Sequence, residues 1–237
     1  MNSKYKVLKF KKNKFENIDD SISIEEPLEI SLKYKDQDKW LTNSLLITMR
    51  TPGHDVDLVR GFLYNEQIIQ NVNEIDNIES FGDKVGKYNI QNKILVTLNN
   101  SNNINISKIK RDFVTNSSCG VCGKSSLDAL EITKKEKTSN SDPKLTKEIV
   151  IQSPTILRNN QSEFSKTGGI HASGLFSSDG KLVSLREDVG RHNALDKMIG
   201  NALDENLIKP KKQFITCSGR LNFELVQKVL MTNIGLM

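Results

Sequence analysis

The sequence concentrates its reactive sulfur in one short stretch, SSCGVCGKSSLDAL at residues 117–130. Two of the three cysteines, Cys119 and Cys122, lie there three residues apart, and a glycine follows each of them. Glycine lets the backbone adopt conformations that other residues avoid. Lys124 and the helix start expected in SSLDAL would both favour the thiolate over the thiol. The stretch therefore predicts a reactive or metal-binding pair of sulfurs on a mobile loop.

Several chemistries remain open for this pair of cysteines. A zinc site would need further ligands, such as His171, His192 or a second CxxC loop across a dimer, because structural zinc takes four ligands. No such ligand pair has a metal-binding spacing here, so we assign no metal site. Thioredoxin-like redox chemistry is disfavoured, since the pair follows a polar stretch. Plain buried thiols are a further alternative. Sulfur carriage fits best, because a low-pKa thiolate can accept sulfur as a persulfide and pass it on.

Zinc deaminase chemistry is excluded by the order and identity of the residues. That class has H-x-E followed downstream by P-C-x-x-C, and its Glu transfers the proton. In this chain Ser173 stands where the Glu should follow His171, and the CxxC precedes the histidine. We therefore reject the reaction, while a similar fold stays compatible with the sequence. The third cysteine, Cys217, is expected to be buried and inert.

Two stretches in the second half predict sites for an anion. Arg191 and His192 begin an amphipathic helix, and a helix N-terminus offers unpaired N–H groups and a partial positive charge. Ser218 and Gly219 form a turn between a strand and a helix, where Arg220 could bind a phosphate bidentately. A capping network and an ordinary turn are equally compatible with these residues.

The elements that position these residues follow from hydrophobic periodicity. Residues 1–50 predict mostly β structure, with a buried strand at 44–50, and residues 87–98 predict a hairpin around Gln91–Lys93. The segment 51–69 predicts a helix with one apolar face, for which Asp55 is a candidate N-cap. Further on we expect a hairpin through Asp179-Gly180, a helix with an apolar stripe from Ala194 to Leu203, and a final strand and helix.

Length and composition bound the function. The 237 residues suffice for one large domain or two small ones, and the net charge of +5 suits a solvated surface or an anionic ligand. Nucleic acid is not an expected partner, because only 6% of residues are aromatic. The chain has no run of 18 apolar residues and no signal-peptide core, which predicts a cytoplasmic protein without a membrane segment. Three cysteines argue against a disulfide framework.

Four blocks together identify a resemblance. They are TPGHDVDLVRGFLYNEQII (51–69), SSCGVCGKSSLDAL (117–130), TGGIHASGLFSSDGKLVSLREDVGRHNALDKMIG (167–200) and CSGRLNFELVQK (217–228). With these blocks the chain resembles the FdhD family, the sulfurtransferase accessory proteins of formate dehydrogenase, from about residue 22 to the end. The CGVCG and EDVGRHNALDK blocks are its most specific part.

The resemblance implies a sulfurtransferase that works through a persulfide. Such a protein takes sulfur from a cysteine desulfurase and passes it to the molybdenum (or tungsten) bis-guanine-dinucleotide cofactor, which is an acceptor substrate and not a permanently bound group. Cys119 would carry the persulfide and Cys122 would assist. For the nucleotide ends of the cofactor, the candidate contacts are Gly168, Gly169, His171, Arg191, His192, Ser218, Gly219 and Arg220. The alternative is a zinc-stabilised or cofactor-binding chaperone module without sulfur transfer.

The resemblance also implies a fold and an assembly. It predicts a cytidine-deaminase-like three-layer α/β core with a smaller N-terminal α+β subdomain, in a homodimer. We expect the subdomain at residues 1–132, ending in the CGVCG loop, a charged linker at 133–148 and the core at 149–237. Family members continue through a further strand and helix, so we expect a C-terminal part to be missing after Met237.

Overall fold

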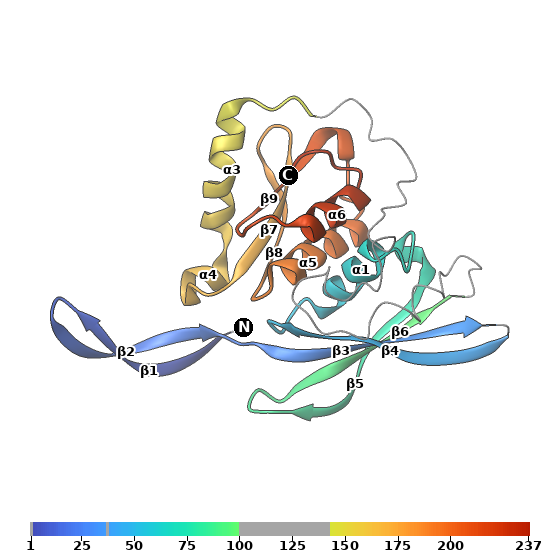
Figure 1. Ribbon diagram of the computed structural model, residues 1–237, viewed down its shortest axis with the longest axis horizontal. Helices are drawn as coiled ribbons and strands as arrows, with labels where there is room; N and C mark the ends of the chain where they lie inside the picture. The colour runs from blue at the N-terminus through green and yellow to red at the C-terminus, as the bar shows by residue number, and fades with distance from the viewer. Residues whose placement is uncertain (1, 37, 100–142) are drawn as a thin grey trace.

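The computed structural model describes residues 2–36, 38–99 and 143–237. Cys119 and Cys122, with most of the expected linker at 133–148, lie outside the described residues. The described part of the chain combines helices with three β-sheets (Figure 1). The α/β class is therefore confirmed, while the division into two domains at the linker stays a prediction.

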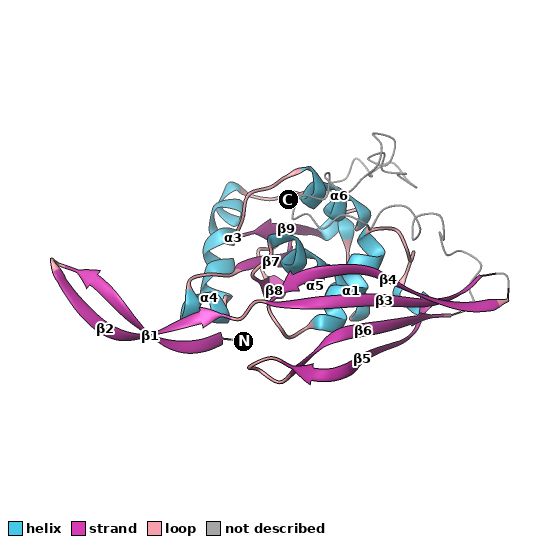
Figure 2. Cartoon of the chain, turned by 60° about the horizontal axis from the view of Figure 1, so that its bottom comes forward, coloured by secondary structure: helices cyan, strands magenta, loops and turns pink. Residues whose placement is uncertain are grey.

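A long β-hairpin opens the chain and projects from the body of the molecule (Figures 1 and 2). Its strands β1 (Asn2–Lys11) and β2 (Lys14–Ser23) pair antiparallel. At its base, the Ser23 hydroxyl donates a hydrogen bond to Thr167 Oγ1 at 2.8 Å. The tip exposes three large apolar side chains, those of Leu8, Phe10 and Phe15. The hairpin is thus anchored at its base, with its tip in solvent.

The second sheet has the strand order β4-β3-β6-β5. Its strands are β3 (Glu26–Asp36), β4 (Lys39–Arg50), β5 (Ile75–Val85) and β6 (Ile90–Leu98). β3 pairs parallel with β6, and the other neighbours pair antiparallel. The expected β structure of residues 1–50 is confirmed. The strand expected to be buried at 44–50 is instead part of the edge strand β4, where Ile47 and Met49 are exposed.

The hairpin predicted around Gln91–Lys93 is wrong. Residues 90–98 form the single strand β6, and its antiparallel partner is β5. The turn falls at residues 86–89, where Gly86 and Asn89 have φ of 72° and 53°. Glycine and asparagine tolerate this left-handed backbone better than the residues at 91–93. The turn therefore forms where the backbone permits it, four residues before the predicted place.

The helix α1 (Asp55–Asn65) covers the second sheet with the apolar face that the sequence predicts. Leu58, Val59 and Leu63 are at most 1% exposed and pack in one core with the strands. The N-cap residue is His54, in the left-handed region at φ 56°, and not Asp55, which is the first helical residue. A short 3-10 helix, η1 (Val72–Glu74), then leads into β5.

The remaining chain forms a three-layer unit, and its middle layer is a small antiparallel sheet of order β8-β7-β9. The strands are β7 (His171–Ser177), β8 (Leu182–Asp188) and β9 (Gln213–Cys217), and the expected Asp179-Gly180 turn joins the first two. One face packs against α3 (Lys147–Asn160), with α4 (Ser162–Thr167) following it. The other packs against α5 (Arg191–Asp204) and α6 (Phe223–Met231), while η3 (Pro210–Lys212) precedes β9. In the described residues no helix is long and apolar enough to cross a membrane.

Helices α1 and α5 join the two sheets through a very close crossing (Figure 1). A Cβ added to Gly61 would lie 1.9 Å from the Asp196 carbonyl oxygen, and one added to Gly200 would lie 1.9 Å from that of Asp57. Only glycine permits this approach of the two backbones. The crossing fixes the walls of the cavity described next.

Candidate functional site

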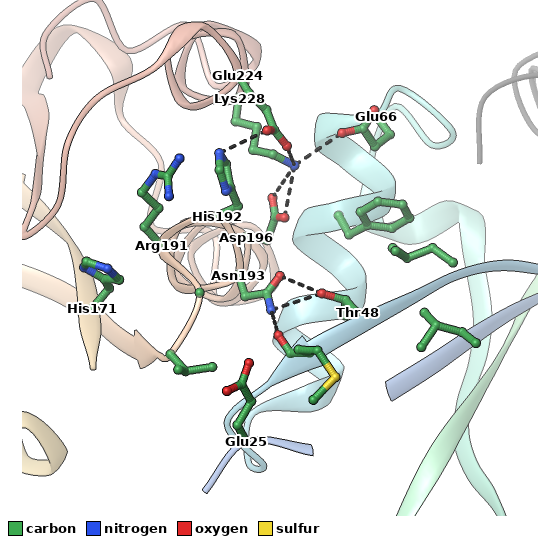
Figure 3. Close-up of a pocket in the computed structure, with 16 residues that line it drawn as sticks. Glu25, Thr48, Glu66, His171, Arg191, His192, Asn193, Asp196, Glu224 and Lys228 are labelled. Atoms are coloured by element: carbon green, nitrogen blue, oxygen red, sulfur yellow. Dashed lines mark hydrogen bonds and ion pairs between the residues drawn. The ribbon is translucent and has the colours of Figure 1, made fainter. Parts of the chain in front are cut away.

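A charged cavity of about 610 Å³ lies between β4, α1, α5 and α6 (Figure 3). The first turn of α5 contributes Arg191, His192 and Asn193, and β4 contributes its segment 46–49. His171, at the start of β7, also lines this cavity. The structure therefore brings together three of the predicted site residues, His171, Arg191 and His192.

The start of α5 has the features of an anion site. Gly190 is the N-cap residue and has no side chain that could accept from the first N–H groups of the helix. Arg191 follows, and its buried Nε has no hydrogen-bond partner among the described residues. Asp188, two residues before the N-cap, accepts from the Gly190 N–H at 2.8 Å and pairs with Lys197 at 2.7 Å, and both side chains are fully or almost fully buried. Backbone and guanidinium donors at this turn can therefore receive an anionic group.

A buried ion network forms the opposite wall of the charged cavity. The Lys228 ammonium lies 3.0 Å from Asp196 Oδ2 and 3.3 Å from Glu66 Oε1, as Figure 3 shows. Burial opposes its charge, but the carboxylates of Asp196, Glu66 and Glu224 outweigh burial and raise the pKa of Lys228 above its usual value. Asn65 donates a further hydrogen bond to Asp196 at 2.6 Å. These groups are already paired with one another.

His192 belongs to the same wall and is held by α6. Its Nε2 lies 3.0 Å from Glu224 Oε2 and 3.1 Å from Asn222 Nδ2. The residue one helical turn away, Asp196, faces Lys228 instead. His192 is therefore part of a network that links α5 to α6.

The Ser218-Gly219-Arg220 turn lies beside His171 and away from the start of α6. The helix begins two residues after Leu221, and Asn222 caps it by accepting from the Leu225 N–H at 3.0 Å. The Ser218 hydroxyl accepts from the Ala172 N–H at 2.8 Å, and a Cβ on Gly219 would lie 3.1 Å from His171 Nδ1. Arg220 is exposed and lines neither of the two cavities described here.

A second cavity, of about 590 Å³, lies on the other side of His171, between α3, α4 and the small sheet. We call it the α3 cavity. Gly168, Gly169 and Ser218 line it, together with Cys217 and Gln161. Burial raises the pKa of Cys217 to about 11, so its thiol is protonated and inert at neutral pH. The eight predicted contacts thus divide between two adjoining cavities, apart from Gly219 and Arg220.

His171 is the residue that the two cavities share, with Val189. Burial lowers the pKa of His171, and the nearby Arg191 lowers it further, against the opposing effect of Asp188. The ring is therefore neutral at pH 7 and gains a proton readily only if a negative charge arrives beside it.

Sequence reasoning missed several residues of these cavities, among them Lys228, Asp196 and Gln161. Lys228 and Asp196 lie 32 positions apart, and charged side chains are normally exposed, so no local signal marks them as a buried pair. In the described part of the chain, no group of three His, Cys, Asp or Glu residues could hold a metal ion.

The fold and the two cavities define a mixed α/β protein in which two cavities with polar and charged lining residues adjoin at His171. The chain belongs to the FdhD/NarQ family, whose model matches residues 23–237. It is 38% identical to the sulfur carrier protein FdhD of Sulfolobus acidocaldarius, over 98% of this chain and 81% of that protein. It is 39% identical to the protein of the same name from Streptomyces coelicolor, over 97% of this chain and 79% of that protein.

A solved structure agrees with this fold. A crystal structure of a protein from Desulfotalea psychrophila, assigned as a formate dehydrogenase accessory protein, superposes with a TM-score of 0.67 and 22% identity. The match covers 99% of this chain and 82% of that one. The resemblance to the FdhD family that the sequence blocks indicate is confirmed.

Proposed function

We propose that this protein is a sulfur carrier in the maturation of formate dehydrogenase. It accepts sulfur from a cysteine desulfurase as a persulfide on Cys119, and transfers it to a molybdenum or tungsten bis-guanine-dinucleotide cofactor. The observation that carries the proposal is family membership at 38–39% identity to relatives named sulfur carrier protein FdhD. The CxxC pair in this chain supplies the thiols that such a role requires.

The transfer onto Cys119 is a thiol–disulfide exchange. The Cys119 thiolate attacks the outer sulfur of the donor persulfide, a new S–S bond forms, and the donor cysteine leaves as a thiolate. No net oxidant or reductant is consumed, because the sulfane sulfur moves from the donor cysteine to Cys119 without a change of oxidation state. Cys122 assists by offering a second thiol three residues away. The compartment proposed for the protein is a reducing cytoplasm, which keeps both thiols available.

The acceptor cofactor carries guanine nucleotides, and the start of α5 supports their binding. Its first N–H groups, which no side chain caps, and the Arg191 guanidinium suit a diphosphate, and His171 can accept a proton as the charge arrives. Gly168, Gly169, His192, Ser218, Gly219 and Arg220 are the further contacts proposed for the cofactor. The cofactor is a substrate of this site and not a resident group.

The proposal extends to the assembly and the core. The partners are a cysteine desulfurase, formate dehydrogenase and a second copy of the chain in a homodimer. The helix–sheet–helix layering around β8-β7-β9 supports a cytidine-deaminase-like core, preceded by a smaller α+β subdomain. Relatives extend further, since the chain covers 79–81% of the two relatives named above.

Mass spectrometry of the whole protein tests the sulfur chemistry. After incubation with a cysteine desulfurase and cysteine, we expect an adduct of about 32 Da, the mass of one persulfide sulfur. Cys119→Ser should abolish it. Cys217→Ser is the matched control and should retain it, because that half-buried thiol is protonated at neutral pH.

The same experiment separates the alternatives. A wild-type protein that gains no adduct on Cys119 would contradict the sulfur-carrier proposal and favour a cofactor-binding chaperone. Stoichiometric zinc that is lost in Cys119→Ser would instead indicate the zinc-stabilised module.

A further inference from the structure

The tip of the β1–β2 hairpin carries large apolar side chains that the described part of the chain leaves in solvent. Leu8, Phe10 and Phe15 are between 60% and 69% exposed. The family model begins at residue 23, so the hairpin precedes the part of the chain that this model describes. Large apolar side chains that gather on an exposed surface favour contact with a partner, because their hydration is unfavourable.

The two faces of the hairpin tip differ in chemistry. Phe10 pairs with Phe15 across the strands, and Leu8 lies two residues before Phe10, so the three side chains share one face. The two phenyl rings have their centroids 5.0 Å apart. The opposite face carries lysines, which are Lys9, Lys11 and Lys14. Residues 8–15 contain four lysines and no acidic residue, so the tip is both amphipathic and cationic.

The hairpin holds this tip away from the body of the molecule (Figures 1 and 2). Near its base, Asn2 donates a hydrogen bond to Glu163 at 3.0 Å, and the Lys87 ammonium donates one to the Tyr5 hydroxyl at 3.2 Å. A strand of ten residues such as β1 spans up to about 33 Å. The tip can therefore contact a surface that the rest of the described chain does not touch.

We propose that the hairpin tip binds the surface of an anionic lipid membrane. Leu8, Phe10 and Phe15 enter the boundary between headgroups and acyl chains, while the lysines of the opposite face reach the anionic headgroups. The sequence predicts no membrane segment, and in the described residues no helix can cross a membrane. A peripheral contact of this kind requires neither. The inference goes beyond the sulfur-carrier proposal and does not depend on it.

A second copy of the chain is a less favourable occupant of the tip. The chain has a net charge of +5, so charge complementarity favours an anionic partner over a copy of the same protein. Lysines along the edge of a sheet also oppose pairing with another strand. A stable protein interface buries about 800 Å² on each side from some 20–30 residues, whereas the tip spans residues 8–15. A bilayer accepts apolar side chains without a surface of matching shape.

Co-sedimentation of the full chain with lipid vesicles tests the proposal. The wild type should bind vesicles that contain phosphatidylglycerol more tightly than vesicles of phosphatidylcholine alone. Salt at about 1 M should weaken this binding, because the Debye length falls to about 3 Å. The double variant Phe10→Ser/Phe15→Ser should bind about tenfold more weakly or less. Val150→Ser/Ile151→Ser is the matched control on α3, where the two side chains are 51% and 69% exposed, and should bind as the wild type does.

Variants of the lysines test the charge of the tip. Lys9→Gln and Lys11→Gln should each weaken binding to the anionic vesicles about fivefold, as expected for one lysine near a charged membrane surface. Binding to neutral vesicles should not change. A wild-type protein that does not bind anionic vesicles, or a Phe10→Ser/Phe15→Ser variant that binds them as tightly, would overturn the proposal.

Fluorescence gives a measurement that does not depend on a loss of binding. Trp40 is the single tryptophan of the chain. In a Trp40→Phe background, Phe15→Trp should be quenched by brominated lipids in anionic vesicles, whereas Ile151→Trp should not. A Phe15→Trp signal that stays unquenched in vesicle-bound protein would contradict insertion of the tip.

Sedimentation velocity without lipid tests the second copy as the occupant. The wild type and Phe10→Ser/Phe15→Ser should have the same association state, because the tip contacts lipid and not another chain. A wild-type dimer that becomes a monomer in the variant would show that a second copy covers the tip, and would overturn the proposal.

Discussion

The two cavities that meet at His171 are built on opposite principles. In the charged cavity, Lys228, Asp196 and Glu66 are buried or half-buried and satisfy one another. In the α3 cavity, apolar walls surround Gln161, whose amide nitrogen has no partner. The first arrangement holds the protein together, because removing one member leaves another charge buried. In the second arrangement, the Gln161 amide nitrogen makes no hydrogen bond within the described residues, so its removal leaves no partner unpaired.

The difference between the two cavities should have its largest effect on the free energy of unfolding. Lys228→Met should lower the free energy of unfolding by about 3–5 kcal/mol, because Asp196, 3% exposed, would keep a buried charge without its partner. Gln161→Met, the matched change in the α3 cavity, should alter stability by less than about 1 kcal/mol, since its amide nitrogen has no hydrogen bond to lose. Urea unfolding measures both. Equal losses in the two variants would remove the distinction between the cavities.

Substitution of two glycines, one in α1 and one in β7, compares how much an added side chain destabilises the protein near each cavity. Gly61→Ala would bring a Cβ to 1.9 Å from a backbone oxygen of α5, which cannot yield, and should cost about 3 kcal/mol or more. A Cβ at Gly174, on the α3 side, would meet side chains only, at 2.7 Å from Leu157 Cδ1, 3.0 Å from Phe176 Cε2 and 3.1 Å from Leu182 Cδ1, and side chains can shift more readily than a backbone. We expect a smaller loss there, about 1 kcal/mol. Thermal unfolding compares the two, with Val56→Ala on the exposed face of α1 as the control, and a Gly174→Ala loss that exceeds the Gly61→Ala loss would contradict this account.

The smallest expected effect concerns the pH dependence of the shared residue. The lowered pKa of His171 means that the unfolded chain binds its proton more readily than the folded one. Its contribution to stability is therefore present above the unfolded value near 6.5 and is lost as the pH falls through the folded pKa. Pyrophosphate at the α5 turn should raise the His171 pKa by about half a unit to one unit, because it favours the charged ring.

NMR titration of the histidine rings measures this shift. His54, whose side chain is 61% exposed and which lines neither cavity, provides the control signal. A His171 pKa that does not rise when pyrophosphate binds would place the anion elsewhere.

The sequence predicted those helices and turns that a short local pattern specifies, such as one turn dipeptide or one apolar helix face. The α1 face with Leu58 and Leu63, the Asp179-Gly180 turn and the α5 stripe all follow from nearest neighbours along the chain, and the structure has them. Helix α3 was not predicted, because Pro154 interrupts its pattern. The structure shows how it is tolerated: the Ser153 hydroxyl donates to the Val150 carbonyl, which the proline nitrogen leaves without a donor, at 3.1 Å.

The sites were predictable only where their residues are close in sequence. Arg191 and His192 were found because they begin a helix, and the turn at Ser218 because it joins a strand to a helix. Lys228 and Gln161 depend on contacts between distant segments, which one sequence does not reveal. The places of Cys119 and Cys122 relative to the cavities stay predictions, since both lie outside the described residues.

The close crossing of α1 and α5 limits which chimeras of two family members can fold. Gly61 and Gly200 each face the backbone of the opposite helix, so the close approach of the two helices depends on the absence of a side chain at both positions. A chimera that takes residues 2–99 from one family member and the rest from another would assemble only where both donors keep glycine at these two positions.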